Sequence, residues 1–332
     1  MQRLSAFLAI ALIATPQCMA PTHAQTLPAQ TWPTRPVTMV VTFAAGSSDD
    51  VLGRILSPRL SELLGQQVII ENIGGAGGMN GVNRVAKATP DGYQFVIGGI
   101  GTFAANQTLY KNPLYNAATD FAPVALIAEQ AEVLTVRKDL PATNLREFIA
   151  YAKANQAKMQ YGTAGAGSSS HLACLMLNAA IGVSTTHVPY RSSALAMQDM
   201  IAGHVDYTCP IISTAAPQIL ANQVKAIANM SKSGTPLLPK LASLHDQGLA
   251  DFDAYYWNGV FLPKGTPAAI VQKLHGSMIA AMETPSVQER LRDIGAVVVS
   301  PERRSPDYLA KFVASEIEKW AVPIKASGIS VE

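Results

Sequence analysis

The fold is decided by the stretch Val37–Leu64 (VTMVVTFAAGSSDDVLGRILSPRLSELL). It opens with Val37–Phe43, a β-branched apolar run typical of a strand that is buried on both faces of a parallel sheet. Ala44–Asp50 (AAGSSDD) is a small polar loop. Val51–Leu64 then carries apolar residues at helical spacing, and Gly65 is well placed to end that helix. The stretch therefore predicts a strand, a loop and a helix in that order.

The same alternation continues along the chain. Further strands are expected at Val68–Ile70, Phe95–Ile97, Met159–Tyr161, Thr186–Val188 and Val205–Cys209. Helices are expected at Leu145–Ala154, Met197–Ala202, Pro267–Met282 and Pro306–Lys325. Strands that alternate with helices indicate an α/β fold with mostly parallel sheets.

Two extended segments could cross between two lobes of such a fold. They are Val124–Val136 (VALIAEQAEVLTV) and the aromatic stretch Tyr255–Leu262 (YYWNGVFL). This predicts a first lobe made of residues 31–125 and 255–332, and an inserted second lobe made of residues 126–254.

The N-terminus has the features of a secretory signal peptide. Arg3 supplies a positive charge, and Leu4–Ala14 is an apolar run too short to span a bilayer. Thr22–Ala24 then offers small residues at the cleavage positions. We expect residues 1–24 to be a signal peptide, and the mature protein to begin at Gln25 in the periplasm. A short membrane anchor is the alternative.

The composition argues against several classes of partner and cofactor. The 332 residues include 14% charged residues with a formal net charge of +2, so nucleic acid is not expected as a partner. Gly99–Ala104 fits the pattern G-x-G-x-x-A, but it does not follow the first strand, so the match is weak evidence for a dinucleotide. The histidines lack metal-binding spacing. No cofactor and no metal are therefore expected.

Three cysteines occur in the chain. Cys18 would leave with the signal peptide, and Cys174 and Cys209 would remain as an even pair in an oxidising compartment. The sequence leaves two states open for this pair: a disulfide, or two buried thiols.

Two loops share one design. Ala44–Asp50 and Gly162–Ser170 (GTAGAGSSS) each follow a strand and open a helix, the second helix starting at about His171. A helix N-terminus offers unpaired N–H groups and about half a positive charge, so it can bind carboxylate or phosphate without Lys or Arg. One such loop alone is usually only a cap and a turn. Two of them on opposing lobes would form an anion site.

A set of motifs, specific in this order and spacing, carries a family resemblance. The motifs are Trp32–Pro36 (WPTRP), Val40–Asp50 (VVTFAAGSSDD), Val68–Gly81 (VIIENIGGAGGMNG), Val85–Tyr93 (VAKATPDGY), Asp120–Val124 (DFAPV), Tyr161–Leu172 (YGTAGAGSSSHL), His187–Arg191 (HVPYR) and Phe261–Pro267 (FLPKGTP). From Trp32 to Glu332, the chain resembles the receptor family of tripartite tricarboxylate transporters, also called the Bug family of periplasmic binding proteins.

The resemblance implies a type II-like Venus-flytrap fold, in which two α/β lobes joined by two crossing strands close on one ligand. It implies a monomeric receptor, and not an enzyme, that captures a small carboxylate for the membrane permease subunits of a tripartite tricarboxylate-type transporter. The carboxylate could be a mono- or dicarboxylate, an aromatic acid or an amino acid. Two alternatives are an exported enzyme acting on a small organic acid and a sensor subunit that presents its ligand.

The resemblance also implies how the ligand is held: by main-chain N–H groups, hydroxyls and bound waters. Carried over by position, the ligand-binding residues are Gly46, Ser47, Ser48 and Asp50 in the first loop, Thr163, Ala164, Gly167, Ser168 and His171 in the second lobe, and Thr102, Phe103 and Arg191 beside them. No catalytic residue is expected, because no activated nucleophile or acid–base pair stands at a loop mouth.

Asp49 departs from the family pattern, in which the first loop usually reads Gly-Gly, two further residues and the Asp. A second acid here would repel a carboxylate ligand if it faced the cleft. Either Asp49 points to solvent, or the ligand carries an amine. We expect the solvent-facing arrangement, because a helix N-terminus stabilises an exposed Asp.

Overall fold

The computed structural model describes residues 32–327 and 330–331, and the predicted strand–loop–helix stretch forms as expected. Strand β1 (Val37–Val41) is followed by helix α1 (Ser48–Leu64), which starts three residues earlier than its apolar pattern suggested. Gly65 ends the helix in a left-handed conformation with φ 70°. Apolar side chains of β1 pack on both sides of the sheet: Val37, Met39 and Val41 join one core cluster, and Val40 joins another.

Within the described residues the strands form two sheets, one of six strands and one of five. The first sheet has the order β11-β4-β10-β3-β1-β2. Its other strands are β2 (Val68–Asn72), β3 (Gln94–Gly99), β4 (Phe121–Ala131), β10 (Tyr255–Pro263) and β11 (Ala296–Val298). The second sheet has the order β7-β6-β8-β5-β9. Its strands are β5 (Val133–Arg137), β6 (Gln160–Thr163), β7 (Thr186–Pro189), β8 (Tyr207–Thr208) and β9 (Val224–Asn229).

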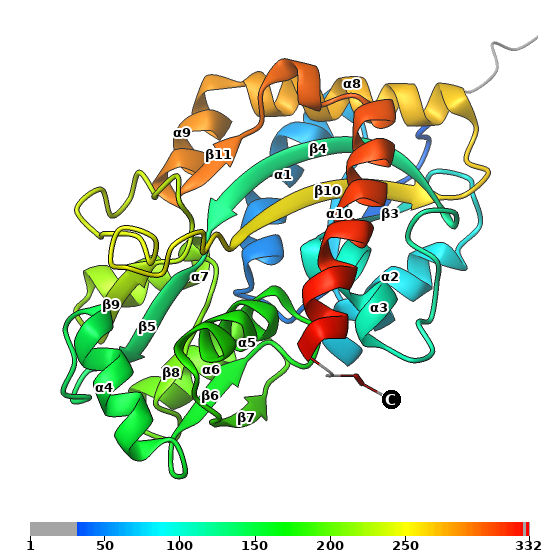
Figure 1. Cartoon of the computed structure of the whole chain (residues 1–332). Coiled ribbons are helices and arrows are strands. Elements are labelled where there is room, and N and C mark those ends of the chain that lie inside the picture. The colour runs from blue at the N-terminus through cyan, green and yellow to red at the C-terminus, as the bar shows by residue number, and fades with distance from the viewer. Residues whose placement is uncertain (1–31, 328–329, 332) are drawn as a thin grey trace, which may run out of the picture. The chain divides into compact units, whose positions relative to one another are not determined.

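The chain passes between the sheets at the two segments predicted to cross. Strand β4 in the first sheet continues into β5 in the second with Glu132 between them. The return passes from β9 to β10, whose first residue, Tyr255, pairs with Ala131 at the end of β4. Figure 1 shows β4 and β10 running side by side. This is a two-lobed α/β fold of the Venus-flytrap kind with two crossing strands. The exact lobe boundaries, residues 31–125 with 255–332 and residues 126–254, remain a prediction.

The expectation of mostly parallel sheets is wrong. Strands β1, β2 and β3 pair in parallel, and so do β6, β7 and β8, as strand–helix alternation requires. Strands β4, β10 and β11, however, form antiparallel pairs in the first sheet, and β5 pairs antiparallel with both β8 and β9 in the second. The physical reason is the crossing itself, since β4 and β10 carry the chain between the sheets in opposite directions.

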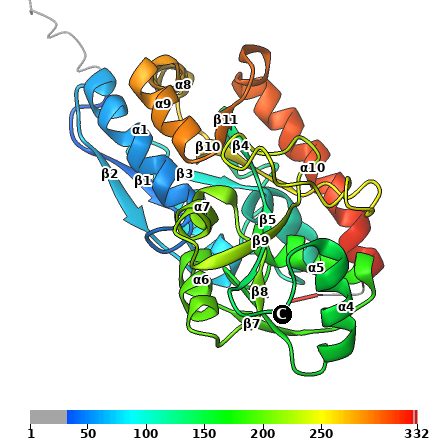
Figure 2. The ribbon, with the colours of Figure 1, turned by 90° about the vertical axis from the view of Figure 1, so that its left-hand side faces the viewer.

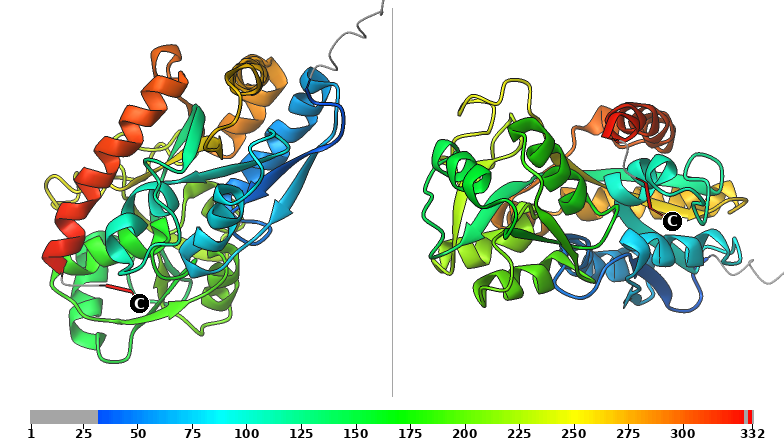
Figure 3. Two further views of the ribbon diagram at one scale, coloured as in Figure 1. Left: turned by 90° about the vertical axis from the view of Figure 1, so that its right-hand side faces the viewer. Right: turned by 60° about the horizontal axis from the view of Figure 1, so that its bottom comes forward.

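Helices cover both faces of the first sheet. One face packs against α1, α8 (Ala268–Glu283) and α9 (Pro285–Asp293), whose Leu52, Leu274 and Leu291 belong to one buried cluster. The other face packs against α2 (Met79–Ala86), the π-helical turn η2 (Gly101–Ala105), α3 (Asn106–Leu109) and α10 (Pro306–Ser327). Figures 2 and 3 show α10 and α8 on opposite sides of the strands.

The second sheet carries its own helices and its own core. These helices are α4 (Leu145–Asn155), α5 (Ser169–Ile181), α6 (Ser193–Ile201) and α7 (Ile212–Leu220). Two short 3-10 turns, η1 (Ala76–Gly78) and η3 (Pro301–Arg303), belong to the chain around the first sheet: η1 follows β2, and η3 follows β11. Residues Trp32–Glu332 form one compact unit, so contacts between the two sheets are part of the fold.

The two remaining cysteines form a disulfide. Cys174 in α5 is bonded to Cys209, which directly follows β8, with the Cα atoms 5.5 Å apart. This settles the pairing that the sequence left open. Cys18, residues 1–24 and the cleavage before Gln25 lie outside the described residues. Within the described part of the chain, no helix combines the length and apolar character needed to cross a membrane.

Candidate ligand-binding site

The two helix-opening loops are near copies of one another in conformation. Each reads Gly-Ser-Ser, at Gly46–Ser48 and Gly167–Ser169. The glycines have φ 82° and 81°, a left-handed conformation that glycine adopts without strain. The following serines, Ser47 and Ser168, are extended N-caps whose hydroxyls accept from Asp50 N–H at 3.4 Å and from His171 N–H at 3.3 Å. The same local chemistry therefore starts α1 and α5.

These two loops meet at a small cavity. Among the described residues, first turns or N-caps of four helices (α1, α5, α6 and α7) line it. The lining residues are Phe43, Ser47, Ser48, Asp49, Ala164, Ser168, Ser169, Ser193, Ile211, Thr214 and Tyr256. Each helix N-terminus contributes unpaired N–H groups and a partial positive charge. Convergence of several N-termini makes a strong anion site.

The polar wall of this cavity consists mainly of hydroxyl groups. Of the described residues that line it, none is Lys, Arg or His, and Asp49 is the one carboxylic acid. Serine hydroxyls both donate and accept hydrogen bonds, so they can adapt to either end of a polar ligand. The positive potential for an anion comes from the backbone and not from a basic side chain.

Asp50 holds the first loop in place. Its carboxylate accepts hydrogen bonds from Gly46 N–H at 2.9 Å, Arg54 Nε at 3.0 Å and Asn72 Nδ2 at 3.0 Å. Burial opposes ionisation of Asp50, but these hydrogen bonds and the Arg54 charge outweigh it and keep the pKa of Asp50 below its ordinary value. Asp50 is therefore ionised and fixes the conformation of the first loop, and it does not line the cavity.

Asp49 lies at the cavity, and the expectation that it points to solvent is wrong. Asp49 is 1% exposed. Its carboxylate accepts from Tyr256 Oη at 2.9 Å, Asn258 Nδ2 at 2.8 Å and Thr42 Oγ1 at 3.1 Å. Strand β10 and the residue after β1 supply these donors, which hold the acid in its inward-facing position. Burial nevertheless raises the pKa of Asp49 to about 6.

Of the residues predicted to bind ligand, four line this cavity: Ser47, Ser48, Ala164 and Ser168. Gly46 belongs with them as the turn before the cap. Their role toward a ligand remains a prediction.

Three of the predicted residues, Thr163, Gly167 and His171, stabilise the conformation of the second loop but do not line the cavity. The Thr163 hydroxyl lies 2.6 Å from His187 Nε2 and accepts from Gly165 N–H at 3.1 Å. The Gly167 N–H donates to His171 Nδ1 at 3.2 Å. Burial and the neighbouring His187 lower the pKa of His171 to about 3, so its ring is neutral and can accept this hydrogen bond.

The remaining predicted residues do not line the cavity. Thr102 is buried, and its hydroxyl bonds the main chain of Gly99. Phe103 is fully buried and stacks on Phe261 with ring centroids 3.7 Å apart, so it is a core residue. Arg191 is exposed and borders a separate pocket, which the second loop also lines with Ala164, Gly165 and Ala166.

Several cavity residues were not among those predicted. Phe43 and Tyr256 belong to segments that the sequence assigned to strands, and Ser169 stands directly after a predicted residue. Ser193 and Thr214 lie in the first turns of α6 and α7. Ser193 follows the motif His187–Arg191, a local signal that could have found it. Helix α7 starts at Ile212 with no side-chain cap, so nothing in the sequence marked that N-terminus.

Each of the two loops contacts the opposite lobe. Ser213 Oγ in α7 bonds Ser48 Oγ in α1 at 2.8 Å, and Tyr110 Oη donates to Ala166 O at 2.9 Å. The cavity between them measures about 20 Å³, roughly the space that one water molecule needs. A larger ligand therefore requires the loops to move apart.

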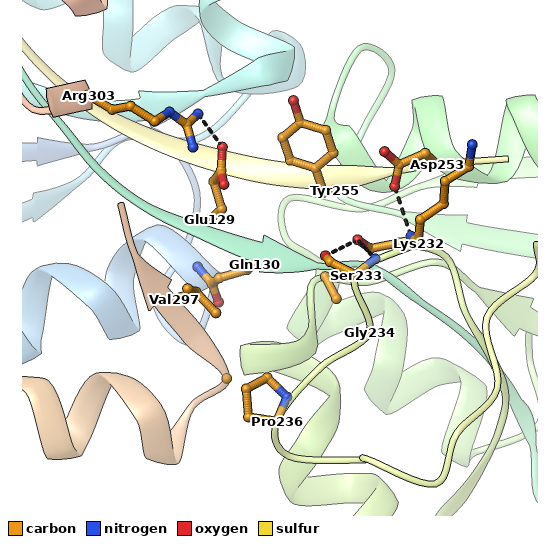
Figure 4. A pocket seen from close by; sticks show the side chains of 13 residues that line it. Glu129, Gln130, Lys232, Ser233, Gly234, Pro236, Asp253, Tyr255, Val297 and Arg303 are labelled. Atoms are coloured by element: carbon orange, nitrogen blue, oxygen red, sulfur yellow. Dashed lines mark hydrogen bonds and ion pairs between the residues drawn. The ribbon is translucent and has the colours of Figure 1, made fainter. Parts of the chain in front are cut away.

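A larger pocket of about 610 Å³ lies elsewhere, beside the crossing strands (Figure 4). Strands β4, β10 and β11 and the segment Ser231–Pro236 contribute to its wall. Its arginine, Arg303, is already bonded to Glu129 at 2.6 Å, and Lys232 N–H donates to Asp253. No helix N-terminus of the described chain converges there. This pocket lacks the features that make an anion site.

No group of three or more His, Cys, Asp or Glu side chains within the described ranges is arranged to hold a metal ion.

Comparisons with known proteins agree with this architecture. The model of the tripartite tricarboxylate transporter family receptor matches residues 52–329. A UPF0065 protein of Agrobacterium vitis is 37% identical over 98% of this chain and 92% of its own length.

Two solved structures are closely similar. The periplasmic binding protein BugD superposes with a TM-score of 0.87 and 37% identity, covering 91% of this chain and 100% of that chain. MatC of Rhodopseudomonas palustris, solved with bound malate, has a TM-score of 0.86 and 37% identity, covering 88% and 100%. The extent of these matches confirms the resemblance found in the sequence. The chain belongs to the tripartite tricarboxylate transporter receptor family, the Bug family of periplasmic solute-binding proteins.

Proposed function

We propose that this protein is a periplasmic receptor that captures one small carboxylate between its two lobes and delivers it to the membrane permease of a tripartite tricarboxylate-type transporter. It acts as a monomer, without cofactor, metal or nucleic acid, and it performs no catalysis. Family membership supports the receptor role, and the malate bound to MatC supports a carboxylate as the ligand class.

The observation that carries this proposal is the convergence of helix N-termini on one cavity. Helices α1 and α5 present matching Gly-Ser-Ser caps from opposite lobes, and α6 and α7 add two more N-termini. A carboxylate there receives N–H donors and serine hydroxyls together. Each charge-assisted hydrogen bond contributes roughly 1.5–3 kcal/mol, so a few of them give useful affinity without any arginine.

The arrangement also explains capture and release. Because donors come from both lobes, full coordination exists only when the lobes are together, so a ligand stabilises the closed arrangement by its differential affinity for it. Opening at the crossing strands separates the two sets of donors and releases the ligand.

A thermal-shift screen followed by calorimetric titration tests the proposal. The panel contains mono-, di- and tricarboxylates, aromatic acids and amino acids, each at several concentrations. A ligand that binds only the folded protein raises the melting temperature, and the rise grows with the ratio of its concentration to its Kd. We expect at least one acid to bind with one-to-one stoichiometry. Ser168→Ala should modestly lower the affinity for that acid, because it removes one hydroxyl. If no acid raises the melting temperature, the proposed function is wrong.

A further inference from the structure

Buried hydrogen-bond acceptors without donors stand behind the cavity. Glu132 is 3% exposed, and its Oε1 has no hydrogen-bond partner in the described part of the chain. Gln130, 2% exposed, likewise has an unpartnered Oε1 among the described residues. Buried polar atoms are nearly always satisfied, so two free acceptors on one crossing segment require an explanation.

Both acceptor residues are in contact with the walls of the cavity. Gln130 Nε2 donates to Ser48 Oγ at 2.8 Å, and Ser48 lines the cavity. Glu132 pairs with Ile211 through a β-bridge and is hydrogen-bonded by Ser169, and both of these residues line the cavity. The residues that carry the unsatisfied acceptors therefore contact the wall of the site, and Gln130 also lines the larger pocket in Figure 4.

Asp49 adds a carboxylate to the cavity wall itself. Its three hydrogen bonds come from Thr42, Tyr256 and Asn258. An ionised carboxylate has about four acceptor sites, so Asp49 keeps capacity for one more donor. The charges of Asp49 and Glu132 both act on Tyr256, so the two acids lie near the same side chain.

The site is thus bipolar. Helix N-termini and serine hydroxyls supply donors, Asp49 supplies an acceptor in the cavity wall, and Glu132 and Gln130 hold further acceptors next to that wall. Among the described lining residues there is no basic side chain to neutralise Asp49. A buried acid group without a cationic partner is costly, and a cation brought by the ligand would remove that cost.

We infer that the ligand is a small zwitterionic amino acid, whose carboxylate binds at the helix N-termini and whose ammonium group binds on the side of Asp49 and Glu132. An ammonium group donates three hydrogen bonds and carries the opposite charge to these acids. A dicarboxylate of the same size would place its second negative charge near Asp49, where like charges repel. This inference rests on the proposed receptor function and names its substrate class.

The test compares ligands that share a carbon skeleton and differ in the amine. The pairs are L-alanine with propionate, L-aspartate with succinate, and L-glutamate with glutarate, with L-malate as the hydroxyl analogue of aspartate. Each is titrated calorimetrically into the mature wild-type protein at pH 8.5, where Asp49 and Glu132 of the free protein are mostly ionised and the amino acids still carry an ammonium group. We expect at least one amino acid to bind at least tenfold more tightly than its amine-free partner.

Two near-isosteric variants test the residues. Asp49→Asn and Glu132→Gln should each lower the preference for the amino acid over its amine-free partner at least tenfold. Asp91→Asn is the matched control, because Asp91 is half-exposed and pairs with Arg35 at 3.3 Å on the surface. If Asp49→Asn fails to fold, Glu132→Gln and the comparison of ligand pairs on the wild type still test the inference.

The outcomes separate the two proposals. If the amine-free acids bind as tightly as the amino acids, or if only acids without an amine bind, the zwitterion inference is overturned and the carboxylate receptor stands. If both folded variants keep the wild-type preference, the assignment to Asp49 and Glu132 is overturned. If no acid of either kind binds, both proposals fail.

Discussion

Ser213 on α7 and Ser48 on α1 share a hydrogen bond of 2.8 Å, although 165 positions in the sequence separate them. Both hydroxyls are buried, and Ser48 Oγ also accepts from Gln130 Nε2. The chain Ser213–Ser48–Gln130 therefore connects the second lobe to a crossing strand of the first through α1. These hydrogen bonds directly connect the contact between the closed lobes to the crossing segment about which the lobes must move.

Replacing Ser213 by Ala should weaken ligand binding without unfolding the protein. A neutral hydrogen bond contributes about 0.5–1.5 kcal/mol, which corresponds to a change of roughly two- to tenfold in affinity. The loss should fall mainly on the dissociation rate, because the bond forms after encounter. Stopped-flow and calorimetric titrations measure both quantities. Ser315→Ala, which removes an exposed hydroxyl bonded to Phe312 O, is the control, and an equal effect of both variants would contradict the role of Ser213.

The buried acids should make the free protein less stable as pH rises. Burial raises the pKa of Asp49 to about 6 and that of Glu132 to about 8, from ordinary values of 3.8 and 4.5. The folded state therefore retains protons that the unfolded chain releases. The contribution of these two acids to stability is therefore most favourable below about pH 4 and is lost as pH rises toward 8.

Glu132→Gln should remove the larger part of this decline. We expect the variant to match the wild type at pH 4 and to exceed it at pH 8.5, by an amount on the order of 2–4 kcal/mol, because one pKa unit corresponds to about 1.4 kcal/mol. Urea unfolding without ligand at both pH values measures the difference. Glu71→Gln, at an exposed ion pair with Arg84, should show no such pH-dependent gain. A wild type that becomes more stable than Glu132→Gln with rising pH would exclude this explanation.

Reduction of the disulfide should destabilise the protein. Cys174 and Cys209 are 35 residues apart, and closing a loop of that length in the unfolded chain stabilises the native state by about 3–4 kcal/mol. A reductant should therefore lower the melting temperature of the wild type. It should leave the melting temperature of a Cys174→Ala/Cys209→Ala double variant unchanged, and a drop in that variant would show that the reductant acts elsewhere.

Much of the first lobe could be predicted from sequence because its signals are local. The run Val37–Phe43 is apolar enough for a strand buried on both faces, and the serines before α1 and α5 mark two helix starts. The crossing segments were visible because apolar and aromatic residues continue beyond the length of an ordinary strand.

Other features depend on partners distant in sequence and could not be read locally. Strand direction in the sheet depends on which strands meet, and this made the prediction of mostly parallel sheets wrong. Asp49 faces inward because Tyr256 and Asn258, more than 200 positions away, supply its donors. Helix α7 contributes to the cavity although it has no capping side chain. Phe103, carried over as a site residue, lies in the core because Phe261 stacks on it.

The second loop offers the sharpest test of backbone-based binding. Gly167 has φ 81°, and a Cβ atom there would lie 2.1 Å from Asn106 Oδ1. Asn106 is fully buried and its amide nitrogen is bonded to Gly77 O, so it has little room to move. We expect Gly167→Ala to distort the contact between the second loop and α3 and to lower ligand affinity at least tenfold, as measured by calorimetry on protein shown to be folded.

Two further variants separate backbone strain and side-chain charge from this effect. Gly182 has φ 68°, and a Cβ atom added there would meet nothing within 4 Å, so Gly182→Ala introduces similar strain far from the loops. It should cost about 1 kcal/mol of stability and leave affinity unchanged. Arg191→Ala should also leave affinity nearly unchanged, because Arg191 is exposed and does not line the cavity. If Arg191→Ala abolishes binding while Gly167→Ala binds like the wild type, a guanidinium and not the helix N-termini holds the carboxylate.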